Sequence, residues 1–149
     1  ALTVNQTLET LILDSCDIPD DSCNILAEKL PSMKGLKELN LNYNPFYNSG
    51  ARCLLDGLKA NVTLLSLQVG MDEFDILIGR HLHMYDIETY ENERHQMQRL
   101  LRVNLFRSRV HHARSMGMGP NLWPLVLESA DNNPDMMYFM LREEIMWRN

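Results

Sequence analysis

The residues best suited to bind a metal lie near the middle of the 149-residue chain. His81 and His83 are separated by one residue, so on a strand both imidazoles would share a face, and Asp86 and Glu88 follow closely. Zinc sites use three or four ligands, and no third ligand here has a defined spacing. Solvated histidines are therefore the favoured interpretation, and we expect neither a metal nor another cofactor.

A basic segment between residues 94 and 114 is the second candidate for chemistry, because arginines can contact phosphates. Only Phe106 lies among them as an aromatic side chain that could stack on a base, and the net charge of −6 argues against general nucleic-acid binding. A solvated face that pairs with acidic residues is the favoured interpretation. A metal- or nucleic-acid-dependent activity in residues 80–114 is kept as an alternative. The segment contains Arg94, His95, Arg99, Arg102, Arg107, Arg109, His111, His112 and Arg114.

Other reactive groups have structural explanations. The sequence contains no nucleophile elbow, phosphate-binding loop or spaced carboxylate pair, so we expect no enzymatic activity. Cys16, Cys23 and Cys53 fall on or next to apolar repeat positions, where a thiol packs as a small hydrophobic group. The chain has three cysteines, and this odd number favours a reducing, intracellular setting such as the cytoplasm over a disulfide scaffold. No apolar run approaches the roughly 20 residues that cross a bilayer, so we expect no membrane partner.

Apolar residues recur along the chain at an interval of 28 residues. Leu8, Leu36 and Leu64 open the segments LETLIL, LKELNL and LLSLQV. A fixed period of this length is typical of a stacked array of structural repeats. It also explains why Asn5 and Asn61 both stand in glycosylation-like Asn-x-Thr sequences, because the repeat places these residues at the same turn.

Each repeat combines a strand with a helix. The last two leucines of LxxLxL alternate with one variable residue, which predicts a short strand. About ten residues later the apolar spacing changes to i, i+3, i+4 and i+7, which predicts a helix. One unit cannot bury its apolar side alone, so neighbouring units must stack. The expected helix caps are Asp20 or Asp21 and then Asn48 or Ser49, and the two apolar stripes are Cys23, Leu26, Ala27, Leu30 and Ala51, Leu54, Leu55, Leu58.

The second unit reads LKELNLNYNPF, then Gly50-Ala51, then LLDGLKANVTL. In this pattern the chain resembles the leucine-rich repeats of the ribonuclease-inhibitor type, over residues 1–71. Cys16 in the first unit replaces Asn44 of the second. The resemblance implies an α/β solenoid with short parallel strands on the concave side and helices on the convex side. It also implies that the Asn44 amide bonds the backbone of adjacent turns, and that the array binds proteins.

The repeat pattern weakens after Val69. We therefore predict repeats in residues 1–71, with residues 72–149 forming a degenerate last repeat, a connection and a helical C-terminal cap. Leu2 aligns with Leu30 and Leu58, so we expect the array to begin before residue 1. Residues 91–106 should be helical, with Met97, Leu100, Leu101 and Leu105 on one face. Breaks at Gly117, Gly119 and Pro120 precede helices expected near residues 122–130 and 134–147.

The tail has a resemblance of its own. LLRVNLFRSR and NLWPLVLESADNNPDMMYFMLREE are similar to the C-terminal regions of large leucine-rich-repeat families of diatoms and related algae. The sequence departs from that pattern at Ser108, where glycine is usual. This similarity implies a fold context and little about function.

The favoured function is a protein-interaction scaffold that binds an unidentified protein, and not nucleic acid, on its concave face. Strand alternation predicts which side chains point outward. The alternative is a passive C-terminal cap of a larger signalling or ubiquitin-ligase substrate-receptor protein whose function lies upstream. For any single outward residue, a solvated strand face without a ligand is an equal alternative. The predicted partner-binding residues are Thr10, Ile12, Asp14, Glu38, Asn40, Asn42, Ser66 and Gln68.

Overall fold

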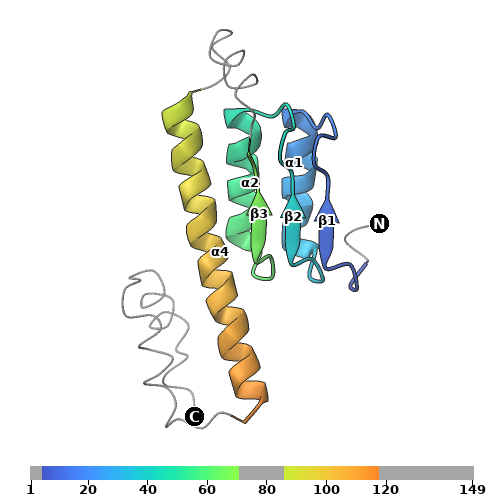
Figure 1. Cartoon of the computed structure of the whole chain (residues 1–149), viewed down its shortest axis with the longest axis vertical. Coiled ribbons are helices and arrows are strands. Elements are labelled where there is room, and N and C mark those ends of the chain that lie inside the picture. The colour runs from blue at the N-terminus through green and yellow to red at the C-terminus, as the bar shows by residue number, and fades with distance from the viewer. Residues whose placement is uncertain (1–4, 71–85, 118–149) are drawn as a thin grey trace. The chain divides into compact units, whose positions relative to one another are not determined.

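The computed structural model describes residues 5–70 and 86–117 of the chain. The described part is a mixed α/β structure with a short parallel sheet, which confirms the predicted class at this level (Figure 1). His81, His83 and the helices expected in residues 122–130 and 134–147 lie outside the described residues. The elements are β1 (Thr10–Ile12), α1 (Asp20–Lys29), the 3-10 helix η1 (Leu30–Ser32), β2 (Glu38–Asn40), α2 (Asn48–Ala60), β3 (Ser66–Gln68) and α4 (Ile87–Ser115).

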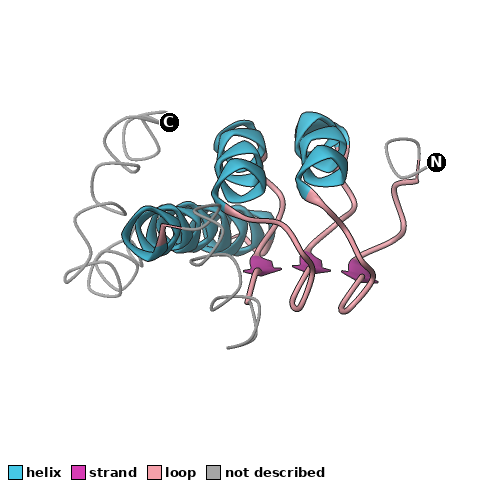
Figure 2. Ribbon diagram, turned by 90° about the horizontal axis from the view of Figure 1, so that it is seen from above, coloured by secondary structure: helices cyan, strands magenta, loops and turns pink. Residues whose placement is uncertain are grey.

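The three strands form one parallel sheet in the order β1-β2-β3. Leu11 pairs with Leu39, and Leu39 pairs with Leu67, so the sequence period of 28 residues is also the register of the sheet. Parallel neighbours need a crossover connection, which α1 and α2 supply. Both helices lie on the same side of the row of strands (Figure 2).

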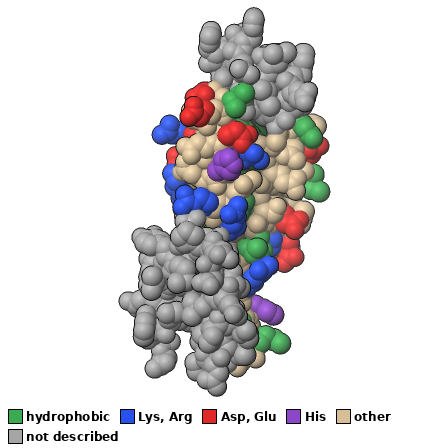
Figure 3. All heavy atoms as spheres, turned by 60° about the vertical axis from the view of Figure 1, so that its left-hand side comes forward, with side chains coloured by type: hydrophobic (Ala, Val, Ile, Leu, Met, Phe, Trp, Pro, Cys, Tyr) green, Lys and Arg blue, Asp and Glu red, His purple; other side chains and the backbone are tan. Residues whose placement is uncertain are grey.

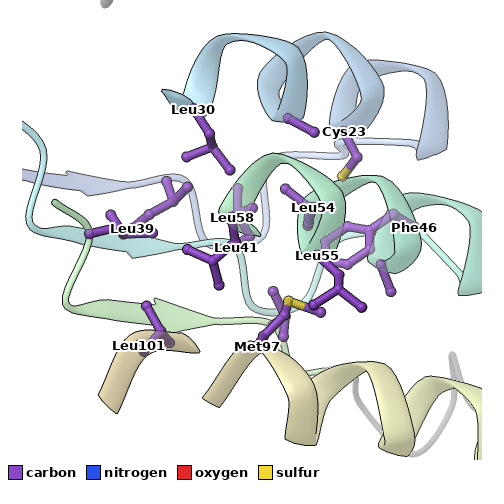
Figure 4. Packing of buried hydrophobic residues seen from close by; sticks show 14 of the residues in the cluster. Cys23, Leu30, Leu39, Leu41, Phe46, Leu54, Leu55, Leu58, Met97 and Leu101 are labelled. Atoms are coloured by element: carbon purple, nitrogen blue, oxygen red, sulfur yellow. The ribbon is translucent and has the colours of Figure 1, made fainter. Parts of the chain in front are cut away.

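The core lies between the sheet and this helix layer. α2 buries Ala51, Leu54, Leu55 and Leu58, as predicted. α1 buries Cys23 and Ala27 of its predicted stripe, whereas Leu26 is only half-buried. These side chains meet buried strand and loop residues, including Leu39, Leu41 and Phe46 (Figure 4). Full burial of each large aliphatic side chain contributes about 1.5–3 kcal/mol relative to exposure. The repeat period therefore produces one continuous apolar layer.

The predicted helix caps are wrong by one residue. The N-cap residues are Pro19 and Tyr47, both with extended backbone and neither with a side-chain cap bond. Asp20 and Asp21 lie in the first turn of α1, where their charge still suits the helix dipole. The carboxylate of Asp20 is directed instead to the next unit, where its Oδ1 accepts hydrogen bonds from the backbone N–H of Tyr47 (2.8 Å) and Gly50 (2.9 Å).

α4 is longer than the helix predicted over residues 91–106. Its start is fixed by Asp86, which accepts hydrogen bonds from the Glu88 N–H and the Thr89 hydroxyl. It ends before Gly117, which has a φ of 75°. Tyr90, Met97 and Leu101 are buried, and Met97 and Leu101 point from α4 into the core cluster (Figure 4). The predicted apolar face of this helix is thus correct at Met97 and Leu101, whereas Leu105 is only half-buried.

The chain divides into two compact units, residues 1–101 and 102–149, with the boundary inside α4. All the packing described above belongs to the first unit. In the second unit Phe106, Val110 and Asn104 are buried. The predicted division at residue 71 concerns the repeat pattern, and it stays a prediction.

Candidate functional site

The eight predicted outward residues lie in three rows across the sheet. Strand pairing places Thr10, Glu38 and Ser66 in one row, and Ile12, Asn40 and Gln68 in the next. Asp14 and Asn42 follow the ends of β1 and β2 at equivalent positions. Side chains alternate across a strand, so these rows face away from the helix layer that covers Leu39. Strand pairing therefore places six of the eight predicted residues on one side of the sheet, and Asp14 and Asn42 follow the strand ends.

Exposure within these rows is uneven. Ile12 is 66% exposed, whereas the neighbouring core residue Leu39 is 1% exposed. Thr10, Glu38 and Gln68 are exposed, and Asp14, Asn40, Asn42 and Ser66 are half-buried. Ile12 is the last residue of β1, which forms one edge of the described sheet, and it is the main exposed apolar side chain of these rows. Partner binding by these residues stays a prediction.

Several of the polar side chains are already occupied by one another. Asn42 Oδ1 accepts the N–H of Gly70 (2.6 Å), and Asn42 Nδ2 donates to Gln68 Oε1 (3.1 Å). Asn40 Oδ1 accepts the N–H of Asn42 (2.9 Å). Thr10 donates a long hydrogen bond to Glu38 (3.4 Å). Asn40 and Asn42 therefore help to hold the strand ends in register, and they are less available to a partner than Ile12 or Glu38.

Tyr43 is a candidate contact residue that sequence reasoning missed. It follows the end of β2, is 51% exposed and has a φ of 56°, and its N–H donates to the Gly70 carbonyl (2.7 Å). A non-glycine residue in the left-handed region is uncommon. Ser15, one repeat earlier, has a φ of 51°. This backbone conformation therefore recurs at equivalent positions of two repeats. Aligning the repeats identifies position 43 as equivalent to position 15, but it does not show that the Tyr43 ring is exposed.

Buried amides hold the turns that position the sheet. Asn44 is 1% exposed, and its Oδ1 accepts the N–H groups of Cys16 (2.9 Å) and Ile18 (3.0 Å). Its Nδ2 donates to the carbonyls of Leu13 (2.8 Å) and Leu41 (2.9 Å). The predicted inward orientation of Asn44 is confirmed. These bonds satisfy groups that would be costly to bury unpaired, so the amide joins two consecutive units.

A second buried amide joins the units at the opposite end of the helices. Asn61 is 2% exposed, and its Oδ1 accepts the N–H groups of Thr63 (2.9 Å) and Leu64 (2.7 Å). Its Nδ2 donates to the Leu30 carbonyl (2.6 Å). Asn5, two repeats earlier, makes the equivalent bonds to Thr7 and Leu8. The structural explanation of the Asn-x-Thr sequences is therefore correct for both asparagines.

Two of the four candidate metal ligands, Asp86 and Glu88, lie within the described residues. Asp86 is committed to the start of α4, and the hydroxyl of Thr89 that bonds its carboxylate lowers the pKa of Asp86. Glu88 lies in the first turn of α4. Within residues 5–70 and 86–117, no three His, Cys, Asp or Glu side chains are grouped to hold a metal ion. His81 and His83 are outside these ranges.

The arginines of residues 94–114 do not form one stripe on α4. At about 100° per residue, positions 94, 99, 102, 107 and 109 are spread over more than half of the helix circumference. Arg94 pairs with Glu91 (2.6 Å), and Arg107 bonds Asn104 (3.4 Å). The side chain of Arg114 is outside the described part. Basic and acidic side chains are interspersed over the described part of the face in Figure 3.

None of the helices that the structure describes has the length and apolarity needed to span a bilayer.

Comparisons with known proteins give a limited similarity. Over 52 residues the chain is 36% identical to the ribonuclease inhibitor of Mus musculus. The match includes 35% of this chain and 11% of that protein, so the chain spans about a tenth of the length of this curated relative. No family model matches the sequence. No solved structure matches it either.

Proposed function

We propose that this chain is a section of a leucine-rich-repeat solenoid of the ribonuclease-inhibitor type, and that it binds a protein partner through the outer face of its sheet. The observation that carries the proposal is the pairing of Leu11, Leu39 and Leu67 in a parallel register of one repeat. This register places variable side chains in rows on one side and helices on the other. The limited similarity to mouse ribonuclease inhibitor, a leucine-rich-repeat protein, supports the same assignment.

The chemistry of the outer face supports a protein as the partner. Ile12 and Tyr43 are exposed apolar groups, and the acidic residues Asp14 and Glu38 lie near Ile12 in the strand register. Apolar and aromatic anchors surrounded by polar groups are typical of protein interfaces, and they give little to a nucleic-acid backbone. The acidic side chains beside them would repel phosphates. The proposal therefore assigns binding rather than catalysis to this face.

The size of the face limits how tightly it can bind alone. Three strands at about 4.8 Å spacing and about five residues at 3.3 Å each give an area of roughly 250 Å². A standard interface buries about 800 Å² on each partner. The described sheet face would therefore supply about a third of a stable interface. We infer that a partner also contacts the rim near Tyr43 or further units.

The alternative is that this section is a passive cap of a larger signalling or ubiquitin-ligase substrate-receptor protein. Asn42 favours it, because its side-chain oxygen and nitrogen are both used within the sheet. In either case we propose a reducing, intracellular setting. All three cysteines are unpaired, and burial raises the pKa of the Cys23 thiol to about 12, which makes it an inert core group.

Two matched isoleucines provide the test. Ile12 on the outer sheet face is 66% exposed, and Ile25 on α1 is 64% exposed. A photo-crosslinking amino acid is placed at position 12 or at position 25 of the full chain, which is then irradiated in an extract of the source cells. We expect a discrete cross-linked protein from position 12 that is absent or much weaker from position 25. Equal products from both positions, or a product from position 25 alone, contradict binding at the outer face.

A further inference from the structure

A hollow of about 260 Å³ opens beside the end of β3, where α4 passes it. Its apolar floor is formed by Leu67, Val69 and Met97. Gln68, Arg94 and Gln98 contribute polar groups around it. All of these residues belong to the first compact unit. Gln68 also belongs to the outer face of the sheet, so the hollow adjoins the rows of predicted partner-binding residues.

The wall beside β3 is held in place from both sides. The Gly70 carbonyl accepts the Tyr43 N–H (2.7 Å), and the Gly70 N–H donates to Asn42 Oδ1 (2.6 Å). On the other side the Tyr90 hydroxyl of α4 donates to the Val69 carbonyl. A site whose walls are already fixed requires little ordering when a ligand binds. The hollow is therefore a preformed feature of the fold.

Hydrogen-bond donors predominate among the groups that remain available. Arg94 uses Nε (2.9 Å) and Nη2 (2.6 Å) to bind Glu91, which leaves Nη1 without a partner among the described residues. Gln68 uses its Oε1 to accept from Asn42, which leaves its amide NH₂. The side-chain amide of Gln98 has no partner within the described ranges. A ligand that fits this rim must carry hydrogen-bond acceptors.

We propose that the hollow is a subsite for a single carboxylate side chain, glutamate or aspartate, of the protein partner; this rests on the proposed function of the adjoining sheet face. A carboxylate accepts from Arg94 Nη1 and from the two amides, while its methylene groups contact the apolar floor. The free edge of the guanidinium can bind a second carboxylate because its donors form a fork. A lysine or arginine side chain would place its positive charge beside the Arg94 guanidinium, and Gln98 Oε1 would be its main side-chain acceptor at this rim.

The volume of the hollow favours one inserted side chain over a whole small molecule as the ligand. Small-molecule sites usually have volumes of about 300–1,000 Å³. The hollow is smaller than that and partly open, so it suits one inserted side chain that remains attached to a larger partner. Glu91 also lies close to the Arg94 charge and weakens the attraction for a second anion. Binding of an isolated glutamate derivative is therefore expected at a Kd on the order of millimolar.

Nuclear magnetic resonance of the ¹⁵N-labelled full chain tests the proposal. The probes are N-acetyl-glutamate N-methylamide and its glutamine and lysine counterparts. We expect the glutamate derivative to shift amide signals of residues 67–70 and 94–98, with weaker or no shifts from the other two. Arg94→Gln should raise the Kd at least about fivefold. Lys59→Gln is the matched control, because Lys59 also pairs with a carboxylate three residues away at 2.6 Å, and it should leave the Kd unchanged.

Equal shifts from the glutamine derivative, or no shifts in residues 67–70 and 94–98, overturn the subsite. So does an equal effect of Arg94→Gln and Lys59→Gln. If Arg94→Gln loses its dispersed spectrum, Gln98→Leu replaces it, and the same fivefold weakening is expected. Cross-linking at position 12 reports separately on the sheet face. Retained cross-linking without glutamate binding rejects the subsite alone, whereas the reverse result rejects the proposed function of the face.

Discussion

Asn48 and Asp86 are joined by two hydrogen bonds, although they are 38 residues apart in sequence. Asn48 Nδ2 donates to the Asp86 carbonyl (2.9 Å), and the Asp86 N–H donates to Asn48 Oδ1 (2.9 Å). Asp20, one repeat before Asn48, makes an equivalent connection to the start of α2. The start of α1 is therefore tied to the start of α2, and the start of α2 is tied to the start of α4. Asn48 thus connects α2 to α4 in the way that Asp20 connects α1 to α2.

Asp20→Ala should destabilise the protein by about 1–2 kcal/mol, because the N–H groups of Tyr47 and Gly50 lose their acceptor. Asp21→Ala is the matched control, since Asp21 lies in the same first turn but is exposed. Urea unfolding followed by circular dichroism measures both variants. Equal losses would mean that the Asp20 bonds across the two units add nothing beyond the charge at the start of α1.

Asn44→Leu should destabilise by at least about 3 kcal/mol despite its added apolar bulk. The substitution leaves the N–H groups of Cys16 and Ile18 and the carbonyls of Leu13 and Leu41 without their side-chain partner. Unpaired buried groups cost about 1–3 kcal/mol each. A neutral or stabilising result in urea unfolding would contradict the structural role of this amide.

Leu39→Ala should cost about 2–5 kcal/mol, because the side chain is 1% exposed within the core cluster. The neighbouring Asn40→Ala should cost about 1 kcal/mol or less, since only its hydrogen bond to the Asn42 N–H is lost. The same urea measurement compares them. Similar midpoints for the two variants would show that the assignment of inner and outer faces is incorrect.

Glu93 should make stability depend on pH. This carboxyl is 6% exposed, and its Oε2 has no hydrogen-bond partner among the described residues. Burial raises its pKa despite the opposing charge of Arg52. A raised folded-state pKa means that the proton is bound more tightly in the folded protein. Its contribution is fully present below the unfolded pKa of about 4.3 and is lost as pH rises through the folded value.

Glu93→Gln should therefore stabilise the protein at pH 7 and have little effect below about pH 4. Urea midpoints at both pH values measure the difference, with Glu28→Gln on exposed α1 surface as the control. Asp86 acts in the opposite direction, because its lowered pKa gives stability that is lost as pH falls through its folded value. A Glu93→Gln effect that is equal at pH 4 and pH 7 would show that its ionisation is not the cause.

The sheet and the helix stripes were predictable because they depend on local periodicity. Leu39 and Leu67 occupy the same position of the 28-residue repeat, and both therefore belong to the inner face of the sheet. α2 buries the residues that the i, i+3, i+4 pattern predicts. The caps were not predictable in this way. Asp20 has the right residue type for a cap, but its carboxylate bonds the next unit, and that choice depends on a neighbour 27 residues away.

The candidate site was predictable in its position and less so in its chemistry. Alternation along the strands places Ile12 and Glu38 on the outer side. It does not reveal that Asn42 is occupied by Gly70 and Gln68, because those bonds join different units. The hollow beside β3 depends on how α4 passes this strand, and no spacing within the repeats contains that information.

The assignment of the outer face to partner binding is tested most directly by affinity, once cross-linking at position 12 has identified the partner. Titration calorimetry compares the parent chain with Ile12→Asp and Ile25→Asp, which place the same charge at two equally exposed isoleucines. Ile12→Asp should raise the Kd at least about tenfold, a loss of about 1.4 kcal/mol, and Ile25→Asp should change it less than about twofold. An unchanged Kd for Ile12→Asp, or an equal loss for both variants, contradicts binding through this face.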